Sequence, residues 1–85
     1  TGIEAETAQA LNNIEAILSE IGWTFSNLSK VSIFVTNMKD YKKVNEIYSI
    51  KFKRDFPARA VIGVKELHLG ASVEIECTAS GSKVV

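Results

Sequence analysis

The chain has 85 residues, enough for one domain, and its charge is balanced, with 10 basic and 10 acidic side chains. This balance argues against a protein that binds nucleic acid mainly through phosphates, because such proteins usually carry a basic excess. One cysteine excludes an internal disulfide, and one histidine without a cysteine pair excludes the usual structural zinc sites. Since so small a domain has a marginal core, we expect it to associate with other subunits.

Targeting features are few. No apolar run approaches the ~20 residues of a membrane-spanning helix, and no signal peptide is visible, so we expect no membrane contact. The sequence starts at Thr1 without an initiator methionine, and we therefore expect further residues upstream in the natural protein. An unpaired cysteine favours a reducing compartment, which indicates the cytoplasm and leaves the mitochondrion open.

The first predicted element is a helix over residues 4–21, ended by Gly22 in the manner of a C′ glycine. Its apolar side chains recur at helical spacing and form one stripe: Leu11, Ile14, Leu18 and Ile21, widened by Ala10 and Ile17. Residues 30–36 then alternate between apolar and polar side chains, which is the period of a strand. We expect one set of this strand to face the core: Val31, Ile33 and Val35.

A second helix follows this strand, with Asn37 or Asp40 as its N-cap. Its predicted buried stripe consists of Tyr41, Val44, Ile47, Tyr48 and Phe52. Pro57 then excludes a helical continuation. Two more strands are expected, over residues 60–67 and 72–79. The last of them alternates, so that one side carries Val73, Ile75 and Cys77.

The element order α-β-α-β-β predicts an α+β fold, a two-layer sandwich with both helices on one face of a mixed sheet. Short connections make strands 30–36 and 60–67 parallel, with a right-handed crossover. The opposite face would carry a mostly polar set: Ser32, Phe34, Thr36, Glu74, Glu76 and Thr78. The pattern leaves two interpretations of this face open, a solvated surface and a subunit interface with a polar cleft at its edge.

Several segments, taken in order, resemble one protein family. Residues 56–61 (Phe-Pro-Ala-Arg-Ala-Val), followed by residues 73–77 (Val-Glu-Ile-Glu-Cys), resemble the C-terminal signature of the Rid (YjgF/L-PSP) family. Residues 31–40, 44–48 and 4–13 resemble its strand and turn, its Val-Asn-x-x-Tyr helix and its first helix. The resemblance implies a chorismate-mutase-like fold that lacks the strands preceding the first helix. We therefore expect residues 1–85 to be a single, N-terminally incomplete Rid-like domain.

The resemblance also implies an activity. The best-known members of the family hydrolyse reactive 2-imino or 2-enamino acids to 2-keto acids and ammonia without a cofactor. Arg59, in isolation an ordinary surface cation, resembles the arginine that binds the substrate carboxylate, a task suited to a planar guanidinium. Glu74, otherwise a solvated strand residue, resembles the carboxylate that positions the hydrolytic water. Asn45 interrupts the apolar stripe of the second helix and either supports the cleft or makes a structural hydrogen bond.

Other features of the chain qualify this implied activity. Val61 stands where many family members have a cysteine, so a thiol there cannot be required. No metal site is predicted, because His68 is the only histidine and Cys77 is interpreted as a buried structural thiol. Two other functions stay open: an RNA-cleaving or translation-inhibiting protein, which the even charge disfavours, and a non-catalytic binder of small carboxylates.

The resemblance further implies a homotrimer with clefts between its subunits. Closed symmetry is the common outcome for homo-oligomers. In such a trimer we expect the sheets to pack face to face around the threefold axis. Phe34 and Ser32 would then be buried, and Glu74 would lie near the seam between two subunits.

Overall fold

Residues 2–52 and 57–79 are described in a computed structural model of the chain. Within these residues, two α-helices, α1 (Gly2–Glu20) and α2 (Tyr41–Phe52), alternate with the strands β1 (Leu28–Val35), β2 (Ala58–Gly63) and β3 (Val73–Ala79). Short 3-10 helices lie in the connections: η1 (Phe25–Asn27), η2 (Met38–Asp40) and η3 (His68–Gly70). The order of helices and strands is the predicted one.

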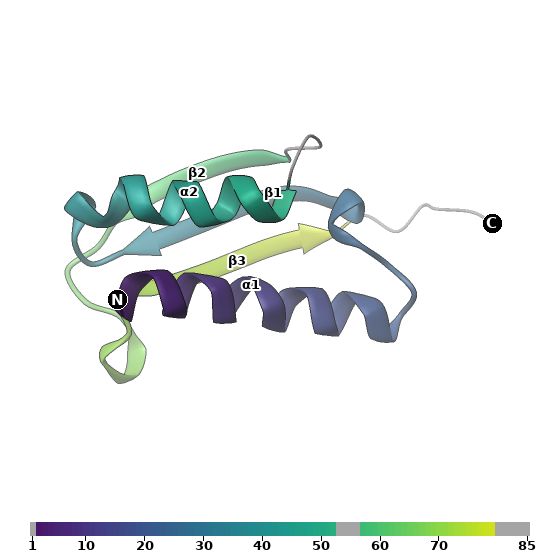
Figure 1. The fold of residues 1–85 in the computed structure, drawn as a ribbon, viewed down its shortest axis with the longest axis horizontal. Coiled ribbons are helices and arrows are strands. Elements are labelled where there is room, and N and C mark those ends of the chain that lie inside the picture. Colours follow the sequence, from purple (N-terminus) through teal and green to yellow (C-terminus); the bar gives the residue numbers. More distant parts are fainter. Residues whose placement is uncertain (1, 53–56, 80–85) are drawn as a thin grey trace.

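The strands form one mixed sheet in the order β2-β1-β3. β1 and β2 are parallel, as expected for strands that α2 connects, with Val31 opposite Arg59. β1 and β3 are antiparallel, with Phe34 opposite Glu74. Both helices cover the same face of this sheet (Figure 1). This arrangement confirms the predicted two-layer α+β fold.

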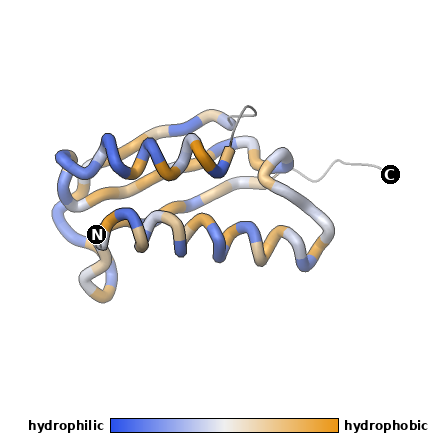
Figure 2. The backbone as a smooth tube through the Cα atoms, in the orientation of Figure 1, coloured by the Kyte–Doolittle hydropathy of each residue, from blue (hydrophilic) through white to orange (hydrophobic). Residues whose placement is uncertain are grey.

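The hydrophobic core lies between the two helices and the sheet. Its most deeply buried apolar side chains come from all these elements: Leu11, Val31, Ile33, Val35, Val44 and Tyr48. Hydrophobic and hydrophilic residues alternate along both helices (Figure 2), so each helix has an apolar side to turn toward the sheet. Val73 is buried in the core, and Ile75 and Cys77 pack against it, as the alternation of the last strand predicted.

The buried stripe of α1 differs from the predicted one. Thr7 is fully buried, because its hydroxyl donates a 2.7 Å hydrogen bond to the carbonyl of Ile3 and is thereby satisfied within the helix. Ile17 and Ile21, both expected in the stripe, are 65% and 59% exposed. Ile21 lies beyond the last helical residue, Glu20, so helical spacing no longer directs it to the core.

Gly22 ends α1 as predicted. Its N–H donates to the carbonyl of Ser19 at 3.1 Å, and the N–H of Trp23 donates to the carbonyl of Leu18 at 2.9 Å. These two bonds make a Schellman motif. The φ angle of Gly22 is 78°, a left-handed conformation that glycine adopts without steric cost.

α2 follows η2 without a break. The side chain of Asn37 accepts the N–H of Lys39 at 3.0 Å, so Asn37 caps the 3-10 turn that leads into α2. Within α2 the deeply buried side chains are Val44, Tyr48 and Phe52. Tyr41, also expected in the buried stripe, is 40% exposed at the first helical residue.

The boundaries of two strands differ from the predicted ranges 30–36 and 60–67. β1 begins earlier, at Leu28, because an irregularity between Leu28 and Lys30 interrupts the alternation on which the prediction rested. Among the described strands, β2 pairs only with β1, and it ends at Gly63, opposite Val35, where β1 itself ends. β2 therefore ends where the strand to which it is hydrogen-bonded ends.

The sheet face opposite the helices, here called the open face, is not covered by any described element. Glu74, Glu76 and Thr78 are exposed on it, and Ser32 and Phe34 are half-buried. Ile62 of β2, opposite Phe34, is 41% exposed. The open face therefore combines an apolar pair with two acidic side chains. Neither described helix is long and apolar enough to cross a membrane.

Candidate functional site

Arg59 is the second residue of β2, and its side chain starts on the helix-covered side of the sheet. Its partner in the parallel register is Val31, which is fully buried beneath the helices. Residues opposite each other on neighbouring strands present their side chains to the same face. β2 lies at the edge of the described sheet, so the long Arg59 side chain extends beyond the core and is exposed.

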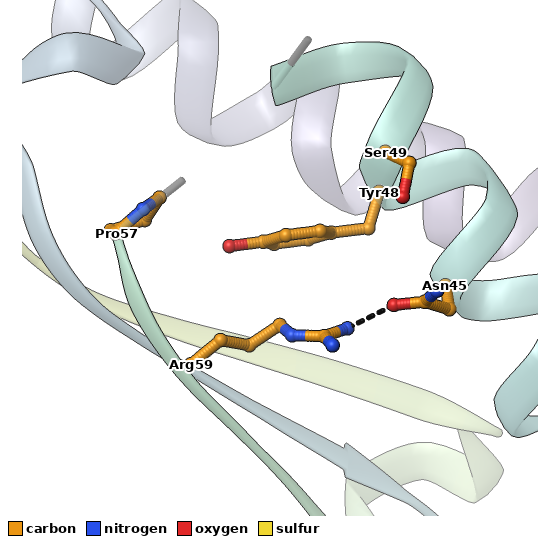
Figure 3. Close-up of a pocket in the computed structure, with 5 residues that line it drawn as sticks. All are labelled: Asn45, Tyr48, Ser49, Pro57 and Arg59. Atoms are coloured by element: carbon orange, nitrogen blue, oxygen red, sulfur yellow. Dashed lines mark hydrogen bonds between the residues drawn. The ribbon is translucent and has the colours of Figure 1, made fainter. Parts of the chain in front are cut away.

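Two side chains of α2 contact the guanidinium of Arg59 (Figure 3). Asn45 accepts a hydrogen bond at Oδ1 from Nη1 of Arg59. The Arg59 Cζ lies 4.9 Å from the centre of the Tyr48 ring, within the ~6 Å range of cation–π contacts. Asn45 and Tyr48 are three residues apart and therefore lie on one side of α2. The hydrogen bond of Asn45 thus joins α2 to β2 at Arg59.

A hollow of about 280 Å³ opens beside this contact, lined by Asn45, Tyr48, Ser49, Pro57 and Arg59. Arg59 is the charged residue of this set, and no acidic side chain among the described residues pairs with it. A guanidinium has five N–H donors, so one bond to Asn45 leaves others for a ligand. The hollow therefore has the charge and donors to bind a small carboxylate in the bidentate manner.

Tyr48 forms an apolar wall of the hollow and belongs to a stack of three rings. Its ring centroid is 4.2 Å from that of Phe52, and the Phe52 centroid is 4.6 Å from that of Phe25. Burial raises the pKa of the Tyr48 phenol above its ordinary value of 10.0, although the charge of Arg59 opposes this rise and Cys77 adds to it. The phenol is thus neutral at physiological pH, and its ring presents an uncharged π face to the cation.

Glu74 lies on the other side of the sheet. It is opposite Phe34, whereas Arg59 is opposite Val31, and side chains at odd spacing along a strand point to opposite faces. Glu74 is exposed on the open face, with Glu76 two residues further along the same strand. Within one chain the structure therefore brings Arg59 and Asn45 together and leaves Glu74 away from both.

Comparison with known proteins assigns the chain to a family. The model of the family described as Endoribonuclease L-PSP matches residues 1–80. The chain belongs to this family, also called Rid. The segments whose resemblance to Rid proteins was noted in the sequence all lie within the matched region.

Individual Rid proteins match over most of the chain. The human 2-iminobutanoate/2-iminopropanoate deaminase is 41% identical over 78 residues, which cover 92% of this chain and 57% of that protein. A Rid-family structure from Yersinia pestis has 44% identity and a TM-score of 0.89, covering 92% of this chain and 63% of that one. TdcF of E. coli, solved with bound serine, has 26% identity and a TM-score of 0.90, covering 96% and 67%. The chain thus spans about 57–67% of the length of these relatives.

Three residues that line the hollow of this Rid-family chain were not predicted as site residues: Tyr48, Ser49 and Pro57. Tyr48 was interpreted as part of the buried stripe, which it also is. A signal for it existed in the sequence, because residues 45, 48 and 49 have the i, i+3, i+4 spacing of one helix side. Once Asn45 was placed near Arg59, the same spacing implied that Tyr48 and Ser49 lie there too.

Cys77 and His68 of this Rid-family chain are not among the described residues that line the hollow. Cys77 is half-buried against the core, and burial raises the pKa of its thiol above the ordinary value of 9.0, which disfavours the reactive thiolate. His68 belongs to η3, in the connection between β2 and β3. Within residues 2–52 and 57–79, no three His, Cys, Asp or Glu side chains come together as a metal site.

Proposed function

We propose that this Rid-family chain carries the carboxylate-binding half of a hydrolytic deaminase, which converts reactive 2-imino or 2-enamino acids to 2-keto acids and ammonia. The observation that carries the proposal is Arg59, whose guanidinium contacts Asn45 and Tyr48 beside a hollow and pairs with no acidic side chain of the described residues. The human relative is named for 2-imino acid substrates, and the E. coli structure contains serine. Both ligands have a carboxylate next to a carbon that bears nitrogen.

The proposed reaction needs water as the second substrate. The substrate carboxylate binds Arg59, which holds the neighbouring C2=N bond at the hollow. The oxygen of water bonds to C2 while a water proton moves to the imine nitrogen, and this gives a tetrahedral aminoalcohol. The hydroxyl proton then transfers to nitrogen, the C2–N bond breaks, and ammonia leaves together with the 2-keto acid.

We propose that Glu74 positions this water and that it comes from a neighbouring subunit. The support is geometric, because Glu74 and Arg59 of one chain lie on opposite faces of the sheet. In a homotrimer whose open faces surround the threefold axis, Phe34 and Ser32 become buried and Glu74 approaches the seam. The β2 edge with Arg59 of the adjoining subunit would form the other side of that cleft.

The test of the proposed function is an assay of the full-length protein with 2-iminobutanoate generated in solution. Ammonia and 2-ketobutanoate should appear in equal amounts and faster than in buffer alone. A folded, assembled protein that produces neither faster than buffer would overturn the proposal. Sedimentation of the same sample tests the trimer, and a fully active monomer at the assay concentration would contradict the shared cleft.

The description of the family model makes RNA cleavage a second candidate function. Its support in the chain is weak, because 10 basic residues are balanced by 10 acidic ones and a large RNA footprint needs a basic excess. Incubation of the same preparation with single-stranded RNA tests it. Cleavage that survives the substitution of Arg59 would assign that activity to another surface. Binding of 2-keto acids without turnover would instead support a non-catalytic carboxylate binder.

A further inference from the structure

We infer that Tyr48 is a positioning residue: its ring fixes the plane of the Arg59 guanidinium so that the free N–H groups face a ligand carboxylate. This inference rests on the proposed carboxylate-binding role of Arg59. The ring lies against the guanidinium, with Arg59 Cζ 4.9 Å from its centroid (Figure 3). The ring therefore restricts the guanidinium from one face. The N–H donors lie in the guanidinium plane, so this contact occupies none of them.

Two restraints of different kinds act on the same group. The Tyr48 ring restricts the tilt of the guanidinium plane, and the bond from Nη1 to Asn45 restricts rotation within that plane. Bidentate binding of a carboxylate requires both, because two parallel N–H donors must lie in the plane of the carboxylate. An exposed arginine on an edge strand without these contacts would have to order its side chain each time a ligand binds.

Core packing holds the Tyr48 ring in its orientation. Tyr48 is 1% exposed, and it stacks on Phe52 with an interplanar angle of 27°. Phe52 stacks in turn on Phe25 at 24°, and both Phe52 and Tyr48 belong to the core. The plane that Arg59 contacts is therefore set by core packing rather than by the ligand.

The same burial separates a positioning role from a catalytic one. Tyr48 as a whole is 1% exposed and its hydroxyl oxygen is buried, so we assign its effect to the contact with Arg59 and not to a contact with substrate. Tyr48 is part of the lining of the hollow, and it is the ring that lies against the Arg59 guanidinium. The inference consequently assigns the effect to the ring, and it predicts that removal of the hydroxyl alone has little consequence.

The experiment compares the full-length wild type with Tyr48→Phe and Tyr48→Leu, using NMR of the Arg59 side chain and pyruvate as the carboxylate probe. In the wild type and in Tyr48→Phe, ring currents should shift the Arg59 side-chain resonances upfield, and the two pyruvate Kd values should agree within about twofold. Tyr48→Leu should lose that shift and weaken pyruvate binding by about threefold to tenfold. In turnover assays its KM should rise more than its kcat falls.

Val44→Ala is the matched control for general damage to α2. Val44 is buried on the same helix, so this variant loses core packing and leaves the Tyr48 ring in place. It should lower the melting temperature and preserve both the Arg59 shift and the pyruvate Kd. If Tyr48→Leu does not fold, site-specific 3,5-difluorophenylalanine at position 48 keeps the ring shape, weakens its π face, and should still weaken pyruvate binding.

Three outcomes would overturn the inference. The first is an unchanged Arg59 shift and pyruvate Kd in Tyr48→Leu or in the fluorinated variant. The second is a loss in Tyr48→Phe as large as that in Tyr48→Leu, which would implicate the hydroxyl. The third is wild-type pyruvate binding no tighter than that of Arg59→Lys, which would remove the carboxylate site itself. Failure of the proposed deaminase looks different, because pyruvate binding and its dependence on the Tyr48 ring would persist without imine hydrolysis.

Discussion

The two charged side chains assigned to the proposed reaction lie in contrasting surroundings. Arg59 contacts an amide and a buried ring, both from α2, whereas Glu74 extends into solvent from the open face, opposite Phe34. The contrast indicates that one chain preorganises Arg59, the group that we propose binds the substrate. Glu74, the group proposed to position water, has no comparable contacts among residues 2–52 and 57–79, so we expect it to acquire its surroundings from a neighbouring subunit.

The largest effect is expected for Glu74→Gln. If Glu74 positions and polarises the water, its amide should lower kcat by roughly 10²-fold or more and leave KM nearly unchanged, as loss of a general base does. Glu76→Gln is the matched control, because Glu76 is exposed on the same face of β3. Steady-state deaminase kinetics of both variants measure the difference. Equal losses in the two would mean that the open face matters only through its charge.

A somewhat smaller loss is expected for Arg59→Lys. Lysine keeps the charge but lacks the planar fork, and charge-assisted hydrogen bonds contribute about 1.5–3 kcal/mol. The kcat/KM should therefore fall by about tenfold to a hundredfold, with circular dichroism and thermal unfolding close to wild type. Full retention of kcat/KM would exclude Arg59 from the site.

Mixing the two impaired variants tests whether Arg59 and Glu74 meet between two subunits. If the protein forms the proposed trimer, assemblies of equal amounts of Arg59→Lys and Glu74→Gln chains should regain activity, because some clefts then receive an intact arginine from one subunit and an intact glutamate from the next. With random assembly, about one cleft in four is intact on both sides, so up to about a quarter of wild-type activity should return. Absence of any recovery, in mixed trimers verified by mass, would contradict the cleft that two subunits share.

A moderate effect is expected for Asn45→Ala. Loss of the acceptor for Arg59 Nη1 removes one of the two restraints on the guanidinium, so KM should rise by about fivefold, the equivalent of ~1 kcal/mol. Asn12→Ala is the matched control, since Asn12 is also a helical amide that accepts a hydrogen bond from a cation, Lys51, but lies outside the hollow. A similar rise of KM in both variants would show that the effect is not specific to Arg59.

The smallest effect concerns alkaline stability. The folded-state pKa values of Cys77 and Tyr48 are raised above 9.0 and 10.0 by burial, so the unfolded chain ionises first as the pH increases. Their contribution to stability is thus complete below these ordinary values and is lost as the pH rises through the raised ones. Between pH 8 and about 11, the free energy of unfolding measured with urea should fall less steeply in Cys77→Ala than in the wild type. In the double variant with Tyr48→Phe it should fall less steeply still. An unchanged slope in both would contradict the burial of these groups.

Much of the fold follows from local sequence patterns. The alternation of residues 31–36 and 73–79 predicted which sides of β1 and β3 face the helices, because a period of two admits only one buried set. Gly22 predicted the end of α1, since few residues other than glycine take a left-handed conformation there. The buried Thr7 was not predicted, because its partner, the carbonyl of Ile3, satisfies the hydroxyl inside the helix and hydropathy does not register such a bond.

The residues of the candidate site were predicted one by one and not as an arrangement. Motif resemblance indicated Arg59, Glu74 and Asn45, and helical spacing would have added Tyr48. The separation of Arg59 from Glu74 follows from the register of three strands. Such a register depends on pairings between distant segments, which a short motif does not encode.

The order in which these parts assemble during folding follows from the chain distances that separate them. Asn45 and Arg59 are 14 residues apart, whereas Ser29 of β1 bonds to the carbonyl of Thr78 of β3 across 49 residues. Contacts that close short loops form sooner and at a lower entropic cost. We therefore expect α2 and β2, which are consecutive in the chain, to form the contact between Asn45 and Arg59 in an early folding intermediate. β3, which carries Glu74, would join the sheet later. Pulse-labelling hydrogen exchange would show this as protection of α2 that precedes protection of β3.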